Sequence, residues 1–292
     1  MASTCPPIIT IMTTTMTMLT EPWMQRAILV ALFLSPVCAL LGVFLTARRM
    51  AFFSDTISHA GLAGIAIGLW LGLAEPTWSL IAVGLLVAAS IYWLKENTEL
   101  LTDTIMALLL SGSVAVGVLL LSALKIRPGE VQGYLFGDIL AVSGAEVVQA
   151  AGLAIIVGVG VFVFLSPLSL ITAQEDMAEV CGIPVQRANY LFVMVLTLTI
   201  ALTIRLLGIV LVTALLVIPP AAARNVTRNL RQQIVLSILL GAIGGGGGTV
   251  LSYYLNCACG PTIVLASVGL FLLTVAVKYV REFGRRVQPS QT

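Results

Sequence analysis

Nine apolar runs, most of them long enough to cross a lipid bilayer, constrain the fold of this 292-residue chain more than any other feature. A bilayer core of roughly 30 Å needs about 20 apolar residues per helix. Hydrophobic residues make up 59% of the chain and charged residues only 10%, too few to cover a water-soluble surface. The runs cover residues 27–47, 50–73, 77–94, 104–124, 146–166, 189–204, 206–220, 232–255 and 262–280. The sequence therefore predicts an all-α, polytopic transmembrane bundle without a soluble catalytic domain.

The seventh run decides how many spans are counted. It covers residues 206–220 and ends in Pro219 and Pro220. As a helix it would be only about 21 Å long. Because proline lacks a backbone N–H and disrupts a regular helix, we expect a short or broken helix here. The predicted count is therefore eight or nine spans.

The distribution of Lys and Arg predicts the orientation in the membrane, because short cytoplasmic loops carry an excess of these residues. With the N-terminus outside, the cytoplasmic side would hold Arg48, Arg49, Lys95, Arg187, Arg224, Arg228, Arg231, Lys278, Arg281, Arg285 and Arg286, and the outside Arg26, Lys125 and Arg127. We therefore predict a flexible extracytoplasmic tail at residues 1–25, a transmembrane domain at 26–282 and a cytoplasmic tail at 283–292. The short clusters of cations do not indicate nucleic-acid binding.

Five consecutive glycines at positions 244–248 superficially resemble a phosphate-binding loop. Such a loop needs a Lys followed by Ser or Thr, and none follows here. The run lies inside an apolar segment, where small residues let two helices approach closely. We therefore expect close helix packing at these glycines.

Asp55 and His59 are the candidate metal ligands, and His59 is the only histidine in the chain. Four residues apart on a helix, they share one face and lie about 6 Å apart along the axis. His59 follows the Arg48–Arg49 pair by ten residues, about 15 Å of helix, which would place it near the middle of the bilayer. Ionisable residues at such depth usually mark a functional site. The alternative is an Asp–His hydrogen bond that only ties two helices together.

Two ligands are too few to hold a divalent ion, but a two-fold dimer with this helix at its axis would supply two carboxylates and two imidazoles. Mixed nitrogen and oxygen ligands suit zinc, manganese or ferrous iron, whereas an all-oxygen cage would indicate calcium or magnesium. The pair therefore predicts a homodimer and a transition metal, and leaves the identity of the metal open.

The segment that contains this pair, FSDTISHAGLAG at residues 53–64, resembles the Asp-x-x-Ser-His-Ala stretch of the permeases of zinc and manganese ABC importers, the ABC-3 family. Residues 134–140 (YLFGDIL) and 208–224 also resemble that family, and the likeness covers about residues 25–280. It implies a homodimeric permease of the bacterial inner membrane that receives manganese, zinc or iron from an extracytoplasmic binding protein. Two cytoplasmic ATPase subunits would drive transport, so this chain needs no catalytic residue and no permanently bound cofactor.

The polar segment 172–186 is the candidate contact with the ATPase. We expect a short helix capped by Thr172, with acidic residues in its first turn and Gly182 at its end. The resemblance implies that this helix fits a groove on the ATPase; the alternative is an ordinary loop helix. The residues proposed for this contact are Glu175, Asp176, Met177, Ala178 and Gly182.

On the outside, Lys125 and Arg127 begin the longest predicted loop and could pair with acidic groups of a binding protein, or could simply anchor to lipid.

Two other classes of transporter remain as alternatives. A proton-coupled secondary transporter would use Asp55 and His59 as a proton relay. A permease of the siderophore or vitamin B12 type would need no metal ligands at its axis. An intramembrane metalloprotease is disfavoured because the chain contains no His-Glu-x-x-His motif.

Overall fold

The computed structural model describes residues 21–73, 75–124, 133, 135, 137 and 139–287, without the side chains of residues 175, 282 and 284–287. The described residues form helices and no strand, which confirms the all-α prediction. The helices are α2 (Pro22–Ala47), α3 (Phe52–Trp70), α4 (Thr77–Asn97), α5 (Thr102–Ala123), η1 (Ile139–Ala141), α7 (Gly144–Val163), α8 (Leu165–Ala173), α9 (Glu175–Val180), α10 (Val185–Leu207), α11 (Ile209–Val226), α12 (Leu230–Leu255) and α13 (Cys259–Val287). Nine of them are long and apolar enough to cross a membrane, the higher of the two expected counts.

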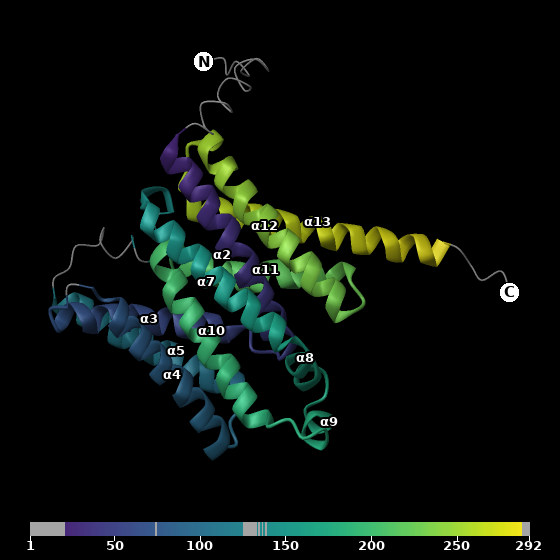
Figure 1. Cartoon of the computed structure of the whole chain (residues 1–292), viewed down its shortest axis with the longest axis horizontal. Coiled ribbons are helices and arrows are strands. Elements are labelled where there is room, and N and C mark those ends of the chain that lie inside the picture. The colour runs from purple at the N-terminus through teal and green to yellow at the C-terminus, as the bar shows by residue number, and fades with distance from the viewer. Residues whose placement is uncertain are drawn as a thin grey trace, which may run out of the picture.

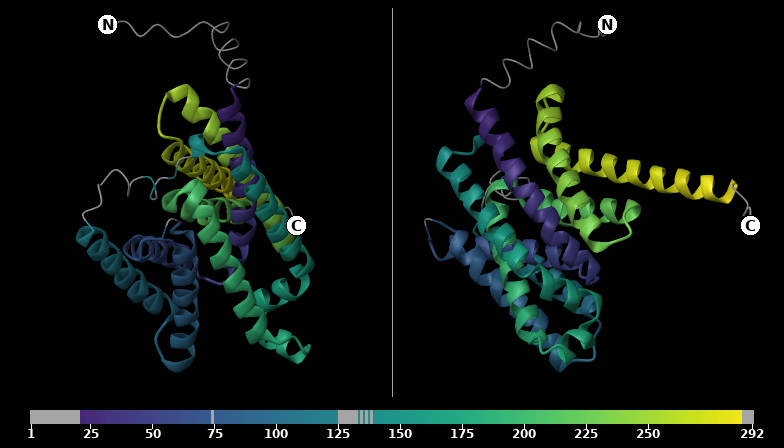
Figure 2. Two further views of the ribbon diagram at one scale, coloured as in Figure 1. Left: turned by 60° about the vertical axis from the view of Figure 1, so that its left-hand side comes forward. Right: turned by 45° about the vertical axis from the view of Figure 1, so that its right-hand side comes forward.

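Helix α2 lies at the centre of the bundle and packs against α7, α11 and α12 (Figure 1). Helices α3, α4 and α5 form a group at one side, in which α3 packs against both neighbours and α4 packs against α10. Helix α13 packs against α11 and α12 and then projects away from the other helices, as the right-hand view in Figure 2 shows. The small helices α8 and α9 connect α7 to α10 at one end of the bundle.

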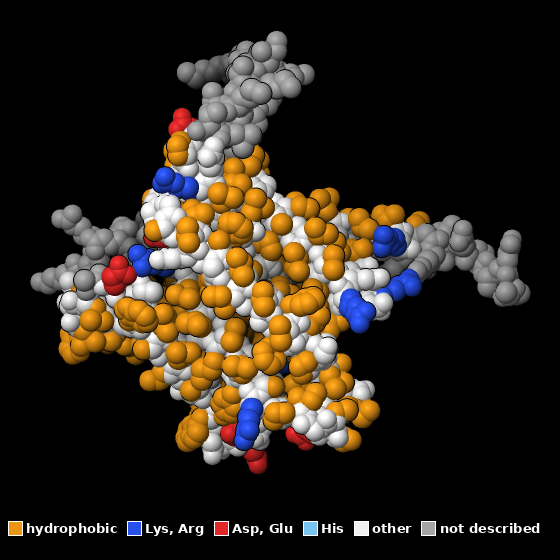
Figure 3. Space-filling model, in the orientation of Figure 1, with side chains coloured by type: hydrophobic (Ala, Val, Ile, Leu, Met, Phe, Trp, Pro, Cys, Tyr) orange, Lys and Arg blue, Asp and Glu red, His pale blue; other side chains and the backbone are white. Residues whose placement is uncertain are grey.

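The outer surface is predominantly apolar. Hydrophobic side chains cover the middle of the face in Figure 3, and the acidic and basic groups lie towards its margins. The exposed apolar residues include Leu86, Leu108 and Phe162, which are 64%, 59% and 77% exposed. Such a surface is stable in lipid and unstable in water. The chain is therefore a multi-pass membrane protein.

The glycines of α12 pack closely against two helices, as the sequence predicted. A Cβ on Gly241 would lie 2.8 Å from the Cβ of Ala39 in α2, and one on Gly248 would lie 2.6 Å from the Cα of Ile263 in α13. Gly247 points elsewhere, and a Cβ there would have no neighbour within 4 Å. Most glycines of this run therefore allow α12 to fit between α2 and α13, and the phosphate-loop interpretation is excluded.

The sequence predicted a short or broken helix at Pro219 and Pro220, and the structure shows the short one: α11 is the shortest of the nine spans at 18 residues and is not broken at the prolines. The helix continues through both prolines to Val226. Neither proline can donate to the preceding turn, so the carbonyl of Leu216 loses its partner at Pro220. That carbonyl lies against Gly42 of α2, where a Cβ would collide with it. Close packing of α2 on α11 therefore accommodates the prolines within one helix.

Candidate metal and coupling sites

The candidate metal ligands lie in the first half of α3. Helix α2 ends at Ala47, and Arg49 adopts a left-handed backbone conformation (φ 58°) in the turn before α3. Asp55 occupies the first turn of α3, where the helix dipole favours a carboxylate, and His59 is the eighth of nineteen residues. The helical rise from Phe52 to His59 is about 10 Å, less than the 15 Å expected from Arg49, because the turn adds no helical rise.

The two candidate ligands share the one face of α3 that its neighbours leave open. Most of α3 is buried, including Phe53 and Ile57 on the inner side. Asp55 and His59 are only half-buried, and Phe52 on the same side is 56% exposed. The Nδ1 atom of His59 is buried and makes no hydrogen bond with the described part of the chain. The predicted placement of Asp55 and His59 on one helix face is therefore present.

The sequence analysis missed Thr213, whose hydroxyl group lies close enough to interact with the Asp55 carboxylate. Thr213 belongs to α11 and donates a hydrogen bond to the carbonyl of Val210 at 3.1 Å. It lies inside the 208–224 stretch, but no local pattern places it opposite Asp55, because the two residues are far apart in sequence. Thr213 therefore adds a hydroxyl oxygen to the polar surroundings of the candidate ligands.

The described residues of one copy of the chain do not supply a complete ligand set. Among the described residues, no three His, Cys, Asp or Glu side chains come together in a group that could hold a metal ion. One carboxylate and one imidazole leave at least two positions of a four-coordinate ion unfilled. The open face of α3 would have to meet further ligands from beyond the described residues of one copy to bind an ion firmly.

The candidate coupling segment forms α9 between α8 and α10. The expected cap is wrong: Gln174 precedes α9, whereas Thr172 belongs to the last turn of α8. Thr172 donates its hydroxyl to the Leu168 carbonyl at 2.6 Å and accepts a hydrogen bond from Arg48 at 3.2 Å. Tertiary contact with Arg48 therefore uses the hydroxyl that the sequence pattern assigned to the cap.

The end of α9 follows the prediction. Gly182 has a positive φ of 77°, and its N–H donates to the Glu179 carbonyl at 2.9 Å. The N–H of Ile183 donates to the Ala178 carbonyl at 3.0 Å. This pair of hydrogen bonds is a Schellman motif, in which glycine is favoured at the left-handed position.

Helix α9 has exposed apolar side chains on its outer side and one buried residue, Ala178, on its inner side. Ala178 is fully buried and packs with Ile171 and Val185. Met177 and Val180 are 53% and 84% exposed, and Asp176 and Glu179 are also exposed. Glu175 begins the helix, but its side chain is not described. Of the residues expected to contact an ATPase, Asp176 and Met177 lie on the accessible surface, and Ala178 instead fixes α9 to α8 and α10.

A second feature that the sequence analysis missed is the ionic cluster around Arg205. Arg205 lies in the last turn of α10, at the opposite end of that helix from α9. Its guanidinium group forms an ion pair with Glu75 at 2.9 Å and lies 3.8 Å from Glu146. The sequence does contain a signal for this cluster, because Arg205 is a charged residue between the sixth and seventh apolar runs. With Arg205 included, the predicted outer side has four cations instead of three. Lys125 and Arg127 lie outside the described residues.

Comparison with known proteins supports one family. Residues 20–278 match the model of the ABC 3 transport family. The chain is 32% identical over 256 residues to the high-affinity zinc uptake system membrane protein ZnuB of Haemophilus influenzae, covering 85% of this chain and 95% of the relative. It is 31% identical to the manganese transport system membrane protein MntC of Halalkalibacterium halodurans, covering 88% and 87%. The solved structure of PsaBC from Streptococcus pneumoniae in complex with Fab superposes with a TM-score of 0.80 and 30% identity, over 90% of this chain and 95% of that one.

Proposed function

The chain belongs to the ABC 3 transport family, and we propose that it acts as the membrane permease subunit of an ATP-driven importer whose cargo is manganese or zinc. The relatives named above are membrane proteins of zinc and manganese transport systems. The observation that carries the proposal is the pair of Asp55 and His59 on the open face of a membrane-spanning helix. In this function the metal is cargo, and the chain itself has no catalytic role.

The metal is held between two copies of the chain. Two α3 helices that face each other across a two-fold axis bring together two carboxylates and two imidazoles, a set that suits four-coordinate zinc and leaves room for water on manganese. The half-buried positions of Asp55 and His59 support this arrangement, because a second copy packed on the open face of α3 would bring its own Asp55 and His59 to the same place. Ferrous iron suits the same ligands, so they do not by themselves select the ion.

Helix α9 is the contact through which ATP hydrolysis on the ATPase drives transport by the permease. Two cytoplasmic ATPase subunits contact the exposed Met177, Val180 and Asp176, and the buried Ala178 transmits their movement to α8 and α10. Exposed apolar side chains at the end of a bundle, away from its middle, support a protein contact there. ATP is hydrolysed on the separate subunit.

The chain lies in the bacterial inner membrane with its N-terminus outside and its C-terminus in the cytoplasm. Adding Arg205 to the outer side gives eleven cytoplasmic cations against four, so the charge argument still favours this orientation. It places α9 on the cytoplasmic side and the Arg205 cluster on the outer side, where a metal-binding protein delivers the ion. Lys125 and Arg127 remain candidates for contacts with that protein.

Uptake by reconstituted vesicles tests the proposal. We expect vesicles with permease, ATPase and binding protein to accumulate manganese or zinc only when ATP is supplied, and competition between the two ions to identify the preferred cargo. Uptake by the permease alone, driven by a proton gradient, would instead support a secondary transporter. Uptake of an iron chelate without uptake of the free ions would support a siderophore-type permease.

A further inference from the structure

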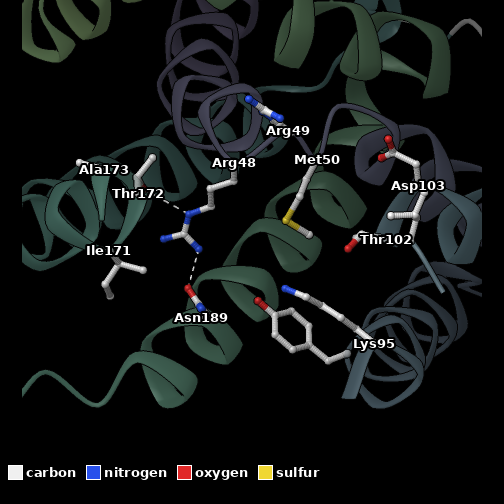
Figure 4. A pocket seen from close by; sticks show the side chains of 12 residues that line it. Arg48, Arg49, Met50, Lys95, Thr102, Asp103, Ile171, Thr172, Ala173 and Asn189 are labelled. Carbon is white, nitrogen blue, oxygen red and sulfur yellow. Dashed lines mark hydrogen bonds between the residues drawn. The ribbon is translucent and has the colours of Figure 1, made fainter. Parts of the chain in front are cut away.

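A basic cavity lies at one end of the bundle, away from the Asp55 and His59 pair. It has a volume of about 420 Å³, within the range of about 300–1,000 Å³ that is typical of small-molecule sites. The turn between α2 and α3, the end of α4, the start of α5, the end of α8 and the first turns of α10 surround it (Figure 4). Four helices and the turn between α2 and α3 therefore meet around one polar space.

Positive charge dominates the lining of this cavity. Arg48, Arg49 and Lys95 contribute three cations and Asp103 one anion, a formal excess of +2. Arg48 and Lys95 extend into the space from different sides, and Asp103 lies apart from them (Figure 4). Within the described part of the chain, neither Arg49 nor Lys95 forms an ion pair, and both are exposed. An anion entering the cavity would meet Arg49 and Lys95, which no carboxylate of the described chain neutralises.

Arg48 is fixed as part of the wall. Its Nε donates to Thr172 in α8 at 3.2 Å, its Nη1 donates to Asn189 in α10 at 2.7 Å, and its guanidinium carbon lies 4.6 Å from the centre of the Phe192 ring. Lys95 approaches the ring of Tyr92 at 6.0 Å, the outer limit of a cation–π contact. The cavity is therefore held open by a rigid arginine, with a lysine and a second arginine that can adjust to a ligand.

We propose that this cavity binds a phosphate-bearing anion, and that the headgroup of an anionic phospholipid supplies it. Guanidinium and ammonium groups are the usual partners of phosphate oxygens. The cavity lies where α2 and α4 end and α5 begins, and the ends of membrane-spanning helices are where lipid headgroups are expected. Basic pockets between membrane helices are known to bind such groups. A bound headgroup connects α4 and α5 to the α2, α8 and α10 wall beside α9.

The surface next to the cavity favours a lipid over a soluble phosphate. Leu101 lines the cavity and is 77% exposed, and Leu100 and Trp93 beside it are 49% and 63% exposed. Tryptophan is enriched at the membrane interface, where its ring lies at headgroup level. Acyl chains can therefore lie along the apolar surface of α4 and α5 while the headgroup occupies the cavity.

Native mass spectrometry of the purified permease tests the proposal with three probes: phosphatidylglycerol, phosphatidylcholine and inorganic phosphate. The test variant is Arg49→Gln with Lys95→Gln, and the matched control is Arg228→Gln with Arg231→Gln, which removes two exposed cations from the start of α12 and the turn before it. Each cation near a membrane surface contributes about fivefold to the affinity for an anionic lipid, so the test variant should bind phosphatidylglycerol roughly twentyfold more weakly. The control should bind it like the wild type.

Displacement of phosphatidylglycerol by millimolar inorganic phosphate would support the anion site and assign it to a soluble phosphate. Equal affinity of the wild-type protein for phosphatidylglycerol and phosphatidylcholine would overturn the proposal, and so would equal losses in the two double variants. The comparison of lipids on the wild type needs no variant, so it decides the question even if the substituted protein fails to fold.

Discussion

The close packing of α12 against α2 and α13 predicts that alanine at Gly248 lowers the stability of the protein, whereas alanine at the adjacent Gly247 does not. In Gly248→Ala, the new methyl carbon would lie 2.6 Å from the Cα of Ile263. Carbon atoms in contact are normally about 3.5–4.0 Å apart, so α13 would have to move by about 1 Å. The obstacle is backbone and cannot rotate away, and overpacking of this kind costs about 1–3 kcal/mol.

Gly247→Ala is the matched control, because its methyl group would have no neighbour within 4 Å. It should leave the stability unchanged or raise it by up to about 1 kcal/mol, the helix preference of alanine over glycine. Gly244→Ala should fall between the two, because its methyl group would approach the Ser267 hydroxyl at 2.7 Å and a hydroxyl can rotate.

The assay is heat-induced unfolding of the purified variants in detergent, followed by tryptophan fluorescence. A difference of about 1–4 kcal/mol between Gly248→Ala and Gly247→Ala corresponds to roughly 2–7 °C in the unfolding midpoint of a chain of this length. If Gly248→Ala unfolds at the same temperature as Gly247→Ala or above it, the close approach of α12 and α13 is not what stabilises this part of the bundle.

Three further predictions concern the ends of the helices. Gly182→Ala should destabilise the end of α9 by about 1–2 kcal/mol because of its positive φ, and faster proteolysis after residue 180 would reveal this; an unchanged cleavage rate would contradict the Schellman motif. Val180→Glu should weaken co-purification of the ATPase without lowering the unfolding midpoint, and Val210→Glu, at a distant exposed position, is its control; equal ATPase retention in both would argue against contact at α9. Arg205→Gln should change the unfolding free energy by less than about 1 kcal/mol, because its ion pairs are solvent-exposed, and a large loss would show that the cluster is more tightly coupled than its exposure indicates.

The sequence predicted those parts of the fold that depend on local composition. The length and hydropathy of each apolar run specify a membrane helix, and the spacing of Asp55 and His59 specifies a shared face of α3. The end of α9 at Gly182 was also predictable, because only a few residue types tolerate a left-handed backbone.

The sequence did not predict the features that depend on contacts between distant segments. The prolines of α11 remain inside a helix, and the carbonyl of Leu216, which receives no N–H from Pro220, packs closely against Gly42 of α2. Thr172 bonds to Arg48, which is 124 positions away in the chain, instead of capping α9. No local pattern contains this information, because it arises from the packing of the whole bundle.

The same limit applies to the candidate site. Local spacing identified two ligands, but Thr213 comes beside Asp55 only when α11 packs against α3. The basic cavity likewise combines residues from four helices and the α2–α3 turn, which lie between positions 48 and 189. Their individual charges were visible in the sequence as orientation signals, and their common location was not.

ATP-dependent metal uptake by vesicles that contain the ATPase and the binding protein tests the central claim most directly, with Asp55→Ala and His59→Ala compared with wild type. Ser58→Ala is the control, because it removes a buried hydroxyl next to His59 that has no hydrogen-bond partner in the described chain. We predict that both ligand variants assemble with the ATPase and lose uptake, and that Ser58→Ala retains it. If uptake persists in both ligand variants, Asp55 and His59 are structural residues and the metal follows another path.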